Sequence, residues 1–322
     1  MNKFDEFSSL LEGPRARGAF TLRGLLASPW SLRIEANSPL TVISMIRGKA
    51  CLSHDNGESV ELVPGDVAVT RAPGHYTVSD KPNRAPTIFV YPGQDCRAPD
   101  GRSLFEEMML GTRTWGNDPD AESLMLVGSY ESMSDVSDRL REALPPLLWV
   151  KNEEWESPLI PLLNDEIARD APGQAAILDR LLDMLLIAIV RKWFDRKETQ
   201  ELPWYEAKGD RIVGRVLKMI HKDPAQAWTL NSLAAKVGVS RAALARRFQD
   251  VVGQSPMAFL TQWRLALAAD LLNEPEETLD TIAERVGYSS AFSLSSAFKR
   301  VRGISPKEHR IRSADPNAGA HQ

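Results

Sequence analysis

The sequence predicts an α+β protein, with a β-rich N-terminal half, a helical segment after it and an all-α C-terminal third. Three observations predict this fold class. Short apolar runs between turn residues fill the first hundred residues, helical periodicity follows, and one helix–turn–helix pattern occurs twice near the C-terminus. The chain has 322 residues, 43% of them apolar and 25% charged, a composition typical of a two-domain globular protein.

The N-terminal part, over about residues 20–100, predicts a small β-barrel or sandwich. Apolar runs of strand length recur between glycine and proline turns at residues 41–46, 60–63, 66–70, 76–78 and 87–91. Asn56-Gly57 between two of these runs is typical of a β-hairpin, because both residue types tolerate positive φ. Many short strands so close together favour a closed or two-layered β structure.

Helical periodicity predicts a second, helical part of the N-terminal domain over about residues 102–197. We expect helices at 104–110, 136–144, 158–168 and about 174–196, and one further strand at 123–127. The last and longest of these helices is apolar on two faces. It therefore needs two packing partners, one of which can be another subunit. We expect residues 1–200 to form one domain, made of the β-rich part and this helical part.

Charge is distributed unevenly along the chain. Residues 211–312 carry 16 Lys and Arg against nine Asp and Glu, a net charge of +7, while the rest of the chain carries −11 and the whole chain −4. A basic end on an acidic chain is typical of a protein that meets a polyanion. We expect residues 198–210 to be a linker before this basic domain and residues 313–322 to be a disordered tail.

The basic third contains one unit twice, at an offset of 49 to 50 residues. The shared positions are Leu230, Ala234, Gly238, Phe248, Gly253, Ser255 and Pro256 in the first copy and Leu279, Ala283, Gly287, Phe298, Gly303, Ser305 and Pro306 in the second. In each copy an apolar helix ends at a glycine. A serine then caps a second helix, whose phenylalanine faces the core. Each copy predicts a helix–turn–helix, with residues 256–272 as the connecting helix.

The outward positions of the second helix in each copy carry basic and hydroxyl side chains. Arginine forks onto guanine or binds phosphate, and serine bonds to either phosphate or base. The candidate DNA contacts are Ser240, Arg241, Arg246 and Arg247 in the first copy, Ser289, Ser290, Ser293, Ser296, Lys299 and Arg300 in the second, and Arg302, Lys307 and Arg310 as phosphate contacts. We expect the first helix to carry more sequence information, since serine discriminates weakly between bases.

Residues 211–312 resemble the DNA-binding domain of the AraC/XylS family of bacterial transcription regulators. The resemblance is carried by the segments Trp228-Thr229-Leu230, Ser240-Arg241, Gly253-Gln254-Ser255-Pro256, Trp263-Arg264, Val286-Gly287-Tyr288 and Phe298-Lys299-Arg300. It implies seven helices, with two recognition helices in major-groove segments about one duplex turn, roughly 34 Å, apart. It also implies base-facing positions at Ala242, Ala245, Arg246, Ala291, Phe292, Ser293 and Ser296.

Residues 42–75 resemble the small β-barrel (cupin) sensor domain of the same family, chiefly through Pro64-Gly65-Asp66 and Pro73-Gly74-His75. The resemblance implies a homodimer that binds double-stranded DNA, responds to a small molecule or oxidant, contacts RNA polymerase and activates transcription. It implies no cofactor. The N-terminus lacks the continuous apolar region of a signal peptide, and residues 181–190 are too short an apolar stretch to span a bilayer, so we expect a cytoplasmic protein.

Three residues are candidate sensor residues: Cys51, Cys96 and His75. An oxidation switch would use a bridge between the two cysteines or one modified thiol, and Arg97 beside Cys96 would favour the thiolate. The alternative is that Cys51 is a small buried residue and Cys96 an incidental loop residue.

Two other functions remain open at this point. Many cupins hold a metal ion with histidines and a carboxylate, so the alternative is a metal-dependent enzyme with an accessory DNA-binding domain. Only His54 and His75 are available there, without a His-x-His pair, and the chain has no P-loop or nucleophile motif. We therefore expect neither metal binding nor enzymatic activity. The second alternative is an architectural protein that binds DNA weakly.

Overall fold

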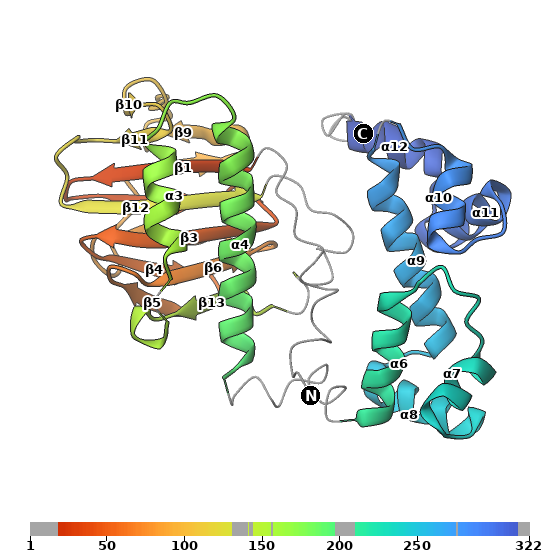
Figure 1. Ribbon diagram of the computed structural model, residues 1–322. Coiled ribbons are helices and arrows are strands. Elements are labelled where there is room, and N and C mark those ends of the chain that lie inside the picture. Colours follow the sequence, from red (N-terminus) through yellow and green to blue (C-terminus); the bar gives the residue numbers. More distant parts are fainter. Residues whose placement is uncertain are drawn as a thin grey trace. The chain divides into compact units, whose positions relative to one another are not determined.

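The computed structural model describes residues 19–130, 141, 144–155, 157–196, 210–274 and 276–314. The described residues up to Arg196 form one compact unit, and those from Asp210 onward form another. Most of the helix expected at 136–144, nearly all of the linker and residues 315–322 of the tail lie outside the described residues. Figure 1 shows the elements of both units.

The first unit is built from two β-sheets. The seven-stranded sheet has the order β10 (Met109–Gly111), β11 (Thr114–Gly116), β1 (Phe20–Leu26), β12 (Ser123–Tyr130), β3 (Leu40–Arg47), β6 (Val67–Arg71) and β13 (Leu147–Val150). The six-stranded sheet has the order β5 (Ser59–Leu62), β4 (Ala50–His54), β7 (Tyr76–Ser79), β2 (Ser31–Ile34), β8 (Ile88–Tyr91) and β9 (Asp95–Arg97). The hydrogen bonds close neither sheet, so of the small barrel or sandwich that the sequence predicted, these strands form the two-layered sandwich.

The core of this unit lies between the two sheets. Ile43, Met45 and Met125 enter it from the seven-stranded sheet, and Leu52 and Val78 enter it from the six-stranded sheet. Alternate residues of each strand point the other way, as the two-residue period of a strand requires. One hydrophobic cluster therefore holds the two sheets face to face.

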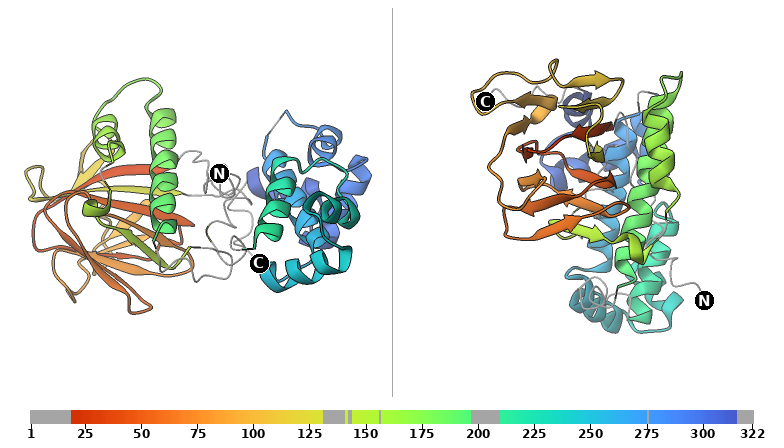
Figure 2. Two further views of the ribbon diagram at one scale, coloured as in Figure 1. Left: turned by 60° about the horizontal axis from the view of Figure 1, so that its bottom comes forward. Right: turned by 90° about the vertical axis from the view of Figure 1, so that its left-hand side faces the viewer.

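Two helices, α3 (Leu159–Ile167) and α4 (Gln174–Phe194), cover the outer face of the seven-stranded sheet (Figures 1 and 2). Leu182 of α4 lies so close to Gly128 of β12 that a Cβ atom on that glycine would overlap it. Beside this contact the Tyr130 hydroxyl donates to Asp183 Oδ1 at 3.1 Å, and both residues are buried. The hydrogen bond gives the buried Tyr130 hydroxyl an acceptor, and the other carboxylate oxygen of Asp183 lies 3.6 Å from Arg180 Nη1.

Within residues 102–130 and 144–150 the structure has strands and turns, where the sequence indicated a mainly helical segment. The helix expected at 104–110 is wrong, because residues 105–108 form turns and β10 pairs with β11 immediately afterwards. The strand expected at 123–127 is confirmed, and it extends to Tyr130 as β12 between β1 and β3. Strand β13 was not expected. Pairing with neighbouring strands decides such short apolar segments, because their own propensity is weak.

The second unit contains seven helices within residues 210–274 and 276–314. They are α6 (Arg211–Lys222), α7 (Leu230–Val237), α8 (Arg241–Val252), α9 (Pro256–Leu272), α10 (Leu279–Val286), α11 (Ala291–Arg302) and α12 (Pro306–Ala314). Helices α6 to α8 surround one core cluster and helices α10 and α11 another, and α9 contributes to both. The two helix–turn–helix motifs expected from the repeat are α7–α8 and α10–α11 (Figure 1).

The contact between Gly128 and Leu182 gives a first prediction. Gly128→Val destabilises the N-terminal unit by about 1–3 kcal/mol through overpacking, and Leu182→Ala by about 2–5 kcal/mol through a cavity. In the double variant the added valine partly fills that cavity, so the cost is smaller than the sum of the two. Urea unfolding, followed by hydrogen exchange of the β12 and α4 amides, measures all three costs. Additive costs would contradict direct packing of these two residues.

Candidate nucleic-acid interface

The first recognition helix, α8, presents its basic side to solvent. Ser240 caps it by accepting from the Ala243 N–H at 3.2 Å, and Leu244 and Phe248 are fully buried. The residues between these apolar positions point outward, because the helix repeats every 3.6 residues. The exposed candidates are Ser240, Arg241, Ala242, Arg246 and Arg247, and Ala245 is half-buried.

Two neighbouring arginines on α8 have different surroundings. Arg246 is exposed, and within the described residues it makes no hydrogen bond or ion pair. Arg247 Nε donates to Asp210 Oδ2, and Asp210 also caps α6 by accepting from the N–H groups of Ile212 and Val213 at 2.9 and 3.1 Å. Burial would raise the pKa of Asp210, but the hydrogen bonds from Arg247 and these amides lower it below its ordinary value. Arg246 is therefore the freer of the two for DNA.

The second recognition helix, α11, uses part of its serine row for capping. Ser290 and Ser293 form a capping box in which each hydroxyl accepts from the other's backbone N–H at 3.2 Å. Ser289 and Ser296 are exposed, Ala291 is half-buried, and Lys299 and Arg300 are exposed toward the C-terminal end of the helix. The hydroxyls of Ser290 and Ser293 are thus already bonded in the free protein.

Phe292, in the first turn of α11, is 82% exposed. A phenyl ring this exposed contributes little to the stability of the free protein, because apolar side chains stabilise a fold by being buried. An apolar side chain at this end of a recognition helix suits the 5-methyl group of thymine in the major groove. The second motif therefore offers an apolar contact beside weakly discriminating serines.

The three candidate phosphate contacts differ in their environments. Lys307 is exposed. The guanidinium of Arg302 lies 5.1 Å from the centre of the Phe298 ring, and burial lowers the pKa of Arg302. Arg310 donates from Nε and Nη2 to the carbonyl oxygens of Leu272 and Glu277 at 2.9 and 2.7 Å. Arg310 is thus engaged in holding the loop before α10, and its expected phosphate contact stays a prediction.

The thiol of Cys96 is not activated by its neighbours. Cys96 lies in β9 and points into the core between the sheets. Burial, together with the charge of Asp95, raises the pKa of the Cys96 thiol to about 11. The Arg97 guanidinium points instead to Asp95, with Nε donating to Oδ2 at 2.8 Å. The expectation that Arg97 favours a thiolate is wrong, because the strand places the two side chains on opposite faces.

A direct Cys51–Cys96 bridge does not fit the sheet. Both thiols are free and buried, and strands β7, β2 and β8 separate β4 from β9. Four strand spacings amount to roughly 19 Å, well beyond the roughly 7 Å limit for bridged Cα atoms. Cys51 also points away from the core face that Cys96 occupies, because Ala50 and Leu52 on either side of Cys51 are the core residues of β4. Burial raises the pKa of Cys51 as well.

The two histidines of the N-terminal unit lie at the end of β4 and just before its neighbour β7. His54 is buried, its Nδ1 accepts from the Asn56 N–H at 3.3 Å, and an added Cβ at Gly74 would lie 2.6 Å from its Nε2. His75, the candidate sensor residue, is half-buried beside that glycine. Among the residues that the structure describes, no three His, Cys, Asp or Glu side chains gather in a way that could hold a metal ion. None of the described helices is long and apolar enough to cross a bilayer.

An open cleft of about 490 Å³ lies at one end of the six-stranded sheet. It is lined by Pro29, Trp30, Thr87, Ile88, Ala98, Pro99, Asp100, Arg102, Leu104, Met108 and Asn117. Apolar side chains with a few polar groups are the usual lining of a small-molecule site. Sequence reasoning missed this site, because its residues come from positions 29 to 117 and share no motif.

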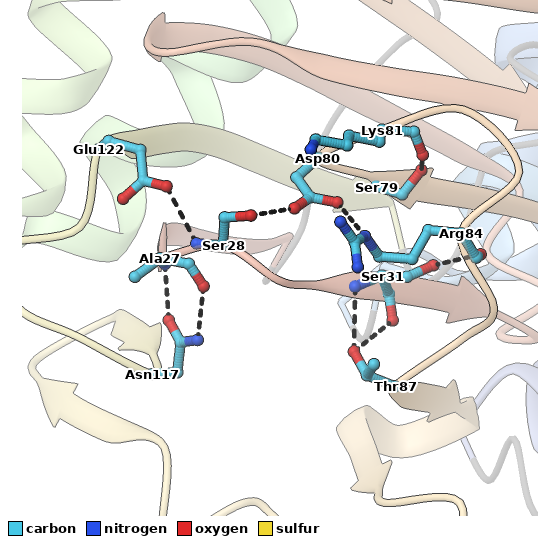
Figure 3. A network of polar contacts seen from close by, with 10 residues as sticks. All are labelled: Ala27, Ser28, Ser31, Ser79, Asp80, Lys81, Arg84, Thr87, Asn117 and Glu122. Carbon is cyan, nitrogen blue, oxygen red and sulfur yellow. Dashed lines mark hydrogen bonds and ion pairs between the residues drawn. The ribbon is translucent and has the colours of Figure 1, made fainter.

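A polar network fixes two walls of this cleft (Figure 3). Asn117 bonds to the backbone of Ala27 in both directions, at 2.7 and 2.9 Å. Thr87 Oγ1 accepts from the Ser31 N–H at 3.0 Å, and Asp80 binds both Ser28 and Arg84. The segment 27–31 is thus held from both sides, so the cleft is largely pre-formed.

Comparison with known proteins identifies both units. Residues 5–195 match the family described as Cupin, and residues 233–312 match the family described as Helix-turn-helix domain. A putative AraC-like transcription regulator of Streptomyces lividans is 30% identical over 87% of this chain and 90% of its own length. The chain belongs to the AraC-like transcription regulators. Recognition from sequence of this family, with its cupin and helix–turn–helix domains, is therefore confirmed.

Two further proteins are similar to this AraC-like regulator. The RCS-specific HTH-type transcriptional activator RclR of Escherichia coli is 34% identical over 49% of this chain and 55% of its own length. The C-terminal domain of AraT, a response regulator from Geobacillus stearothermophilus, is 38% identical, with a TM-score of 0.31, over 32% of this chain and 85% of that one.

The difference between the two arginines of α8 gives the second prediction. Arg246→Ala weakens binding of the AraC-like regulator to its preferred DNA by about 1–3 kcal/mol and relaxes the preference at one base pair. Arg247→Ala, which leaves Asp210 without its partner, lowers thermal stability as well. Competition binding with a set of single-base variants at fixed salt measures both effects. Equal weakening on every sequence would show that Arg246 contacts only phosphate.

The exposure of Phe292 gives the third prediction. Phe292→Ala weakens binding by about 1 kcal/mol, roughly fivefold, because one buried methyl contact is lost. Replacing the contacted dT by dU removes the same methyl group, so it weakens the wild type equally and leaves the variant unchanged. The matched control is Val301→Ala, because Val301 is an exposed apolar residue on the opposite side of α11. Binding of the wild type that ignores dU at every position would contradict the contact.

Proposed function

We propose that this AraC-like regulator binds a specific operator with both recognition helices and activates transcription by contact with RNA polymerase. The observation that carries the proposal is the exposed basic and hydroxyl surface of α8 and α11 within one unit. The proposed contacts are Ser240, Arg241, Ala242, Ala245, Arg246, Arg247, Ser289, Ser290, Ala291, Ser293, Ser296, Lys299, Arg300, Arg302 and Lys307. This function takes place in the bacterial cytoplasm, where the DNA is.

We further propose that residues 1–200 sense an effector and dimerise, that 198–210 link, and that 211–312 bind DNA. The effector is a small molecule or an oxidant. The cleft beside Trp30 supports a small molecule with an apolar body and a polar end that reaches Arg102 or Asn117. The name of the E. coli relative supports an oxidant, but the buried thiols of Cys51 and Cys96 favour the small molecule. Relatives named as regulators over nearly the whole chain favour sensing over catalysis.

The proposed dimer contact is the outer stripe of α4. Ile177 is 47% and Met184 53% exposed. Leu181 lies between them and Ala188 four residues after Met184, and both are half-exposed. Leu162 of the neighbouring α3 is 52% exposed. A contiguous apolar stripe on a helix whose other face already covers a sheet is typical of an interface. A second copy of the chain can bury it by symmetric packing.

A gel shift of the full-length protein on the DNA flanking its own gene tests the function. We expect a specific complex whose affinity does not change after mild oxidation, because both thiols are buried. Loss of specificity, with equal affinity for unrelated DNA, would favour an architectural protein. A footprint that oxidation changes, and that Cys96→Ser makes insensitive, would establish an oxidant as the effector.

The stripe on α4 gives the fourth prediction. Met184→Glu places a charge in the proposed interface and shifts the chain toward monomer, with weaker binding to an operator that needs two subunits. Ala176→Glu adds the same charge to the same helix outside the stripe and leaves the dimer intact. Sedimentation velocity measures the oligomeric state of both variants. A Met184→Glu protein that remains as dimeric as Ala176→Glu would contradict the assignment.

A further inference from the structure

We propose that Arg264 is a positioning residue that locks the two helix–turn–helix motifs into one fixed spacing on DNA. The inference rests on the proposed function, because it assumes that both motifs bind one operator. Arg264 lies on α9, the helix that connects the motifs. Its role is to hold a loop of the first motif against the turn of the second.

The first part of this clamp is a pair of hydrogen bonds to the loop 223–228, between α6 and α7. Arg264 donates from Nε to the Pro224 carbonyl at 2.7 Å and from Nη2 to the Gln226 carbonyl at 2.8 Å. Within this loop the Trp228 indole donates to the Asp223 carbonyl at 2.8 Å, and the buried Trp228 belongs to the core cluster of the first motif. Charged donors to two carbonyls in a fork are strong and directional hydrogen bonds.

The second part of the clamp is a close approach between that loop and the turn before α11. Gly287, at φ +84°, ends α10, and an added Cβ there would lie 2.6 Å from the Ala225 oxygen and 2.8 Å from Arg264 Nη2. The next residue, Tyr288, has its ring 5.9 Å from the Arg264 guanidinium carbon. Glycine is needed at this position both for its left-handed conformation and because the loop leaves no room for a side chain.

These contacts join the loop 223–228 to the turn at Gly287. The connecting helix α9 does not by itself fix the position of these two segments relative to each other. Hydrophobic packing on α9 brings both motifs to one helix, but packing is not directional. The turn held at Gly287 leads directly into α11, so fixing the turn fixes the first residues of that recognition helix. The guanidinium is half-buried, with Nε and Nη2 both donating to the loop carbonyls, and burial lowers the pKa of Arg264.

Arg310 provides a matched control. It also donates from Nε and Nη2 to two backbone carbonyls, those of Leu272 and Glu277. Its partners lie at the end of α9 and in the loop before α10, so the bonds stay on the second motif's side. Arg310→Met removes the same number and kind of hydrogen bonds as Arg264→Met without releasing one motif from the other.

The test uses the full-length chain and a duplex that the wild type selects from a random DNA library. One base pair is then inserted between the two half-sites, which shifts them by roughly 3.4 Å and rotates one around the duplex. We expect the insertion to weaken wild-type binding at least about 30-fold and Arg264→Met binding only about threefold. In the variant the two motifs can move relative to each other and so adapt to the new spacing. That freedom costs entropy when the variant binds the original duplex. Arg264→Lys, which keeps the charge, behaves like Arg264→Met.

The control separates positioning from stability. Arg310→Met lowers the melting temperature but keeps the wild-type response to the insertion. Without DNA, hydrogen exchange of the full chain speeds up in both 223–228 and 287–288 in the Arg264 variants, and in neither segment in Arg310→Met. Wild-type spacing discrimination in both Arg264 variants, or equal weakening at every spacing, would overturn the clamp while leaving DNA binding intact. A wild-type chain that selects no DNA would overturn the proposed function and the clamp together.

Discussion

The burial of helix α9 in two separate cores is the constraint on which the DNA-binding unit depends. Trp263 and Ala266 belong to the cluster of the first motif, and Leu265 and Ala269 to that of the second. The helix therefore presents apolar side chains to both cores, as a helix with partners on both sides must. The position of each recognition helix depends on the core that its motif shares with α9. Directional contacts such as those of Arg264 then decide the rotation that non-directional burial leaves free.

In the N-terminal unit, too, burial and specific contacts have different roles. Burial between the sheets sets their spacing, while specific contacts place α4 on the outer face. Gly128 permits the close approach of Leu182, and the bond from Tyr130 to Asp183 makes the burial of a carboxylate tolerable. Burial and the nearby carboxylates raise the pKa of Tyr130 well above its ordinary value, so this pair stays a neutral donor and its acceptor. One face of α4 is thereby fully used, and its apolar outer stripe is left for a partner.

One carboxylate links helix α6 of the DNA-binding unit to the first recognition helix. Asp210 caps α6 and binds Arg247 of α8, so the cap of α6 contacts the first recognition helix directly. That arrangement was not visible in the sequence, where Arg247 looked equivalent to Arg246. The same holds for Arg310, whose basic charge suggested phosphate but whose partners are backbone carbonyls. Charge alone does not show whether an arginine is free, because its partner can lie 37 or 38 residues away.

The sequence by itself determined the features that depend on neighbouring residues. The repeat located both motifs, serine caps marked the starts of the second helices, α8 and α11, and Gly238 and Gly287 marked the turns. Local rules suffice there, because capping and positive φ are properties of a few adjacent residues. Only the tertiary structure decided that 104–110 is not a helix, that Cys96 faces the core away from Arg97, and that a cleft forms beside Trp30. These outcomes depend on strand pairing and burial between residues far apart in the chain, and such long-range contacts leave no periodic signal in the sequence.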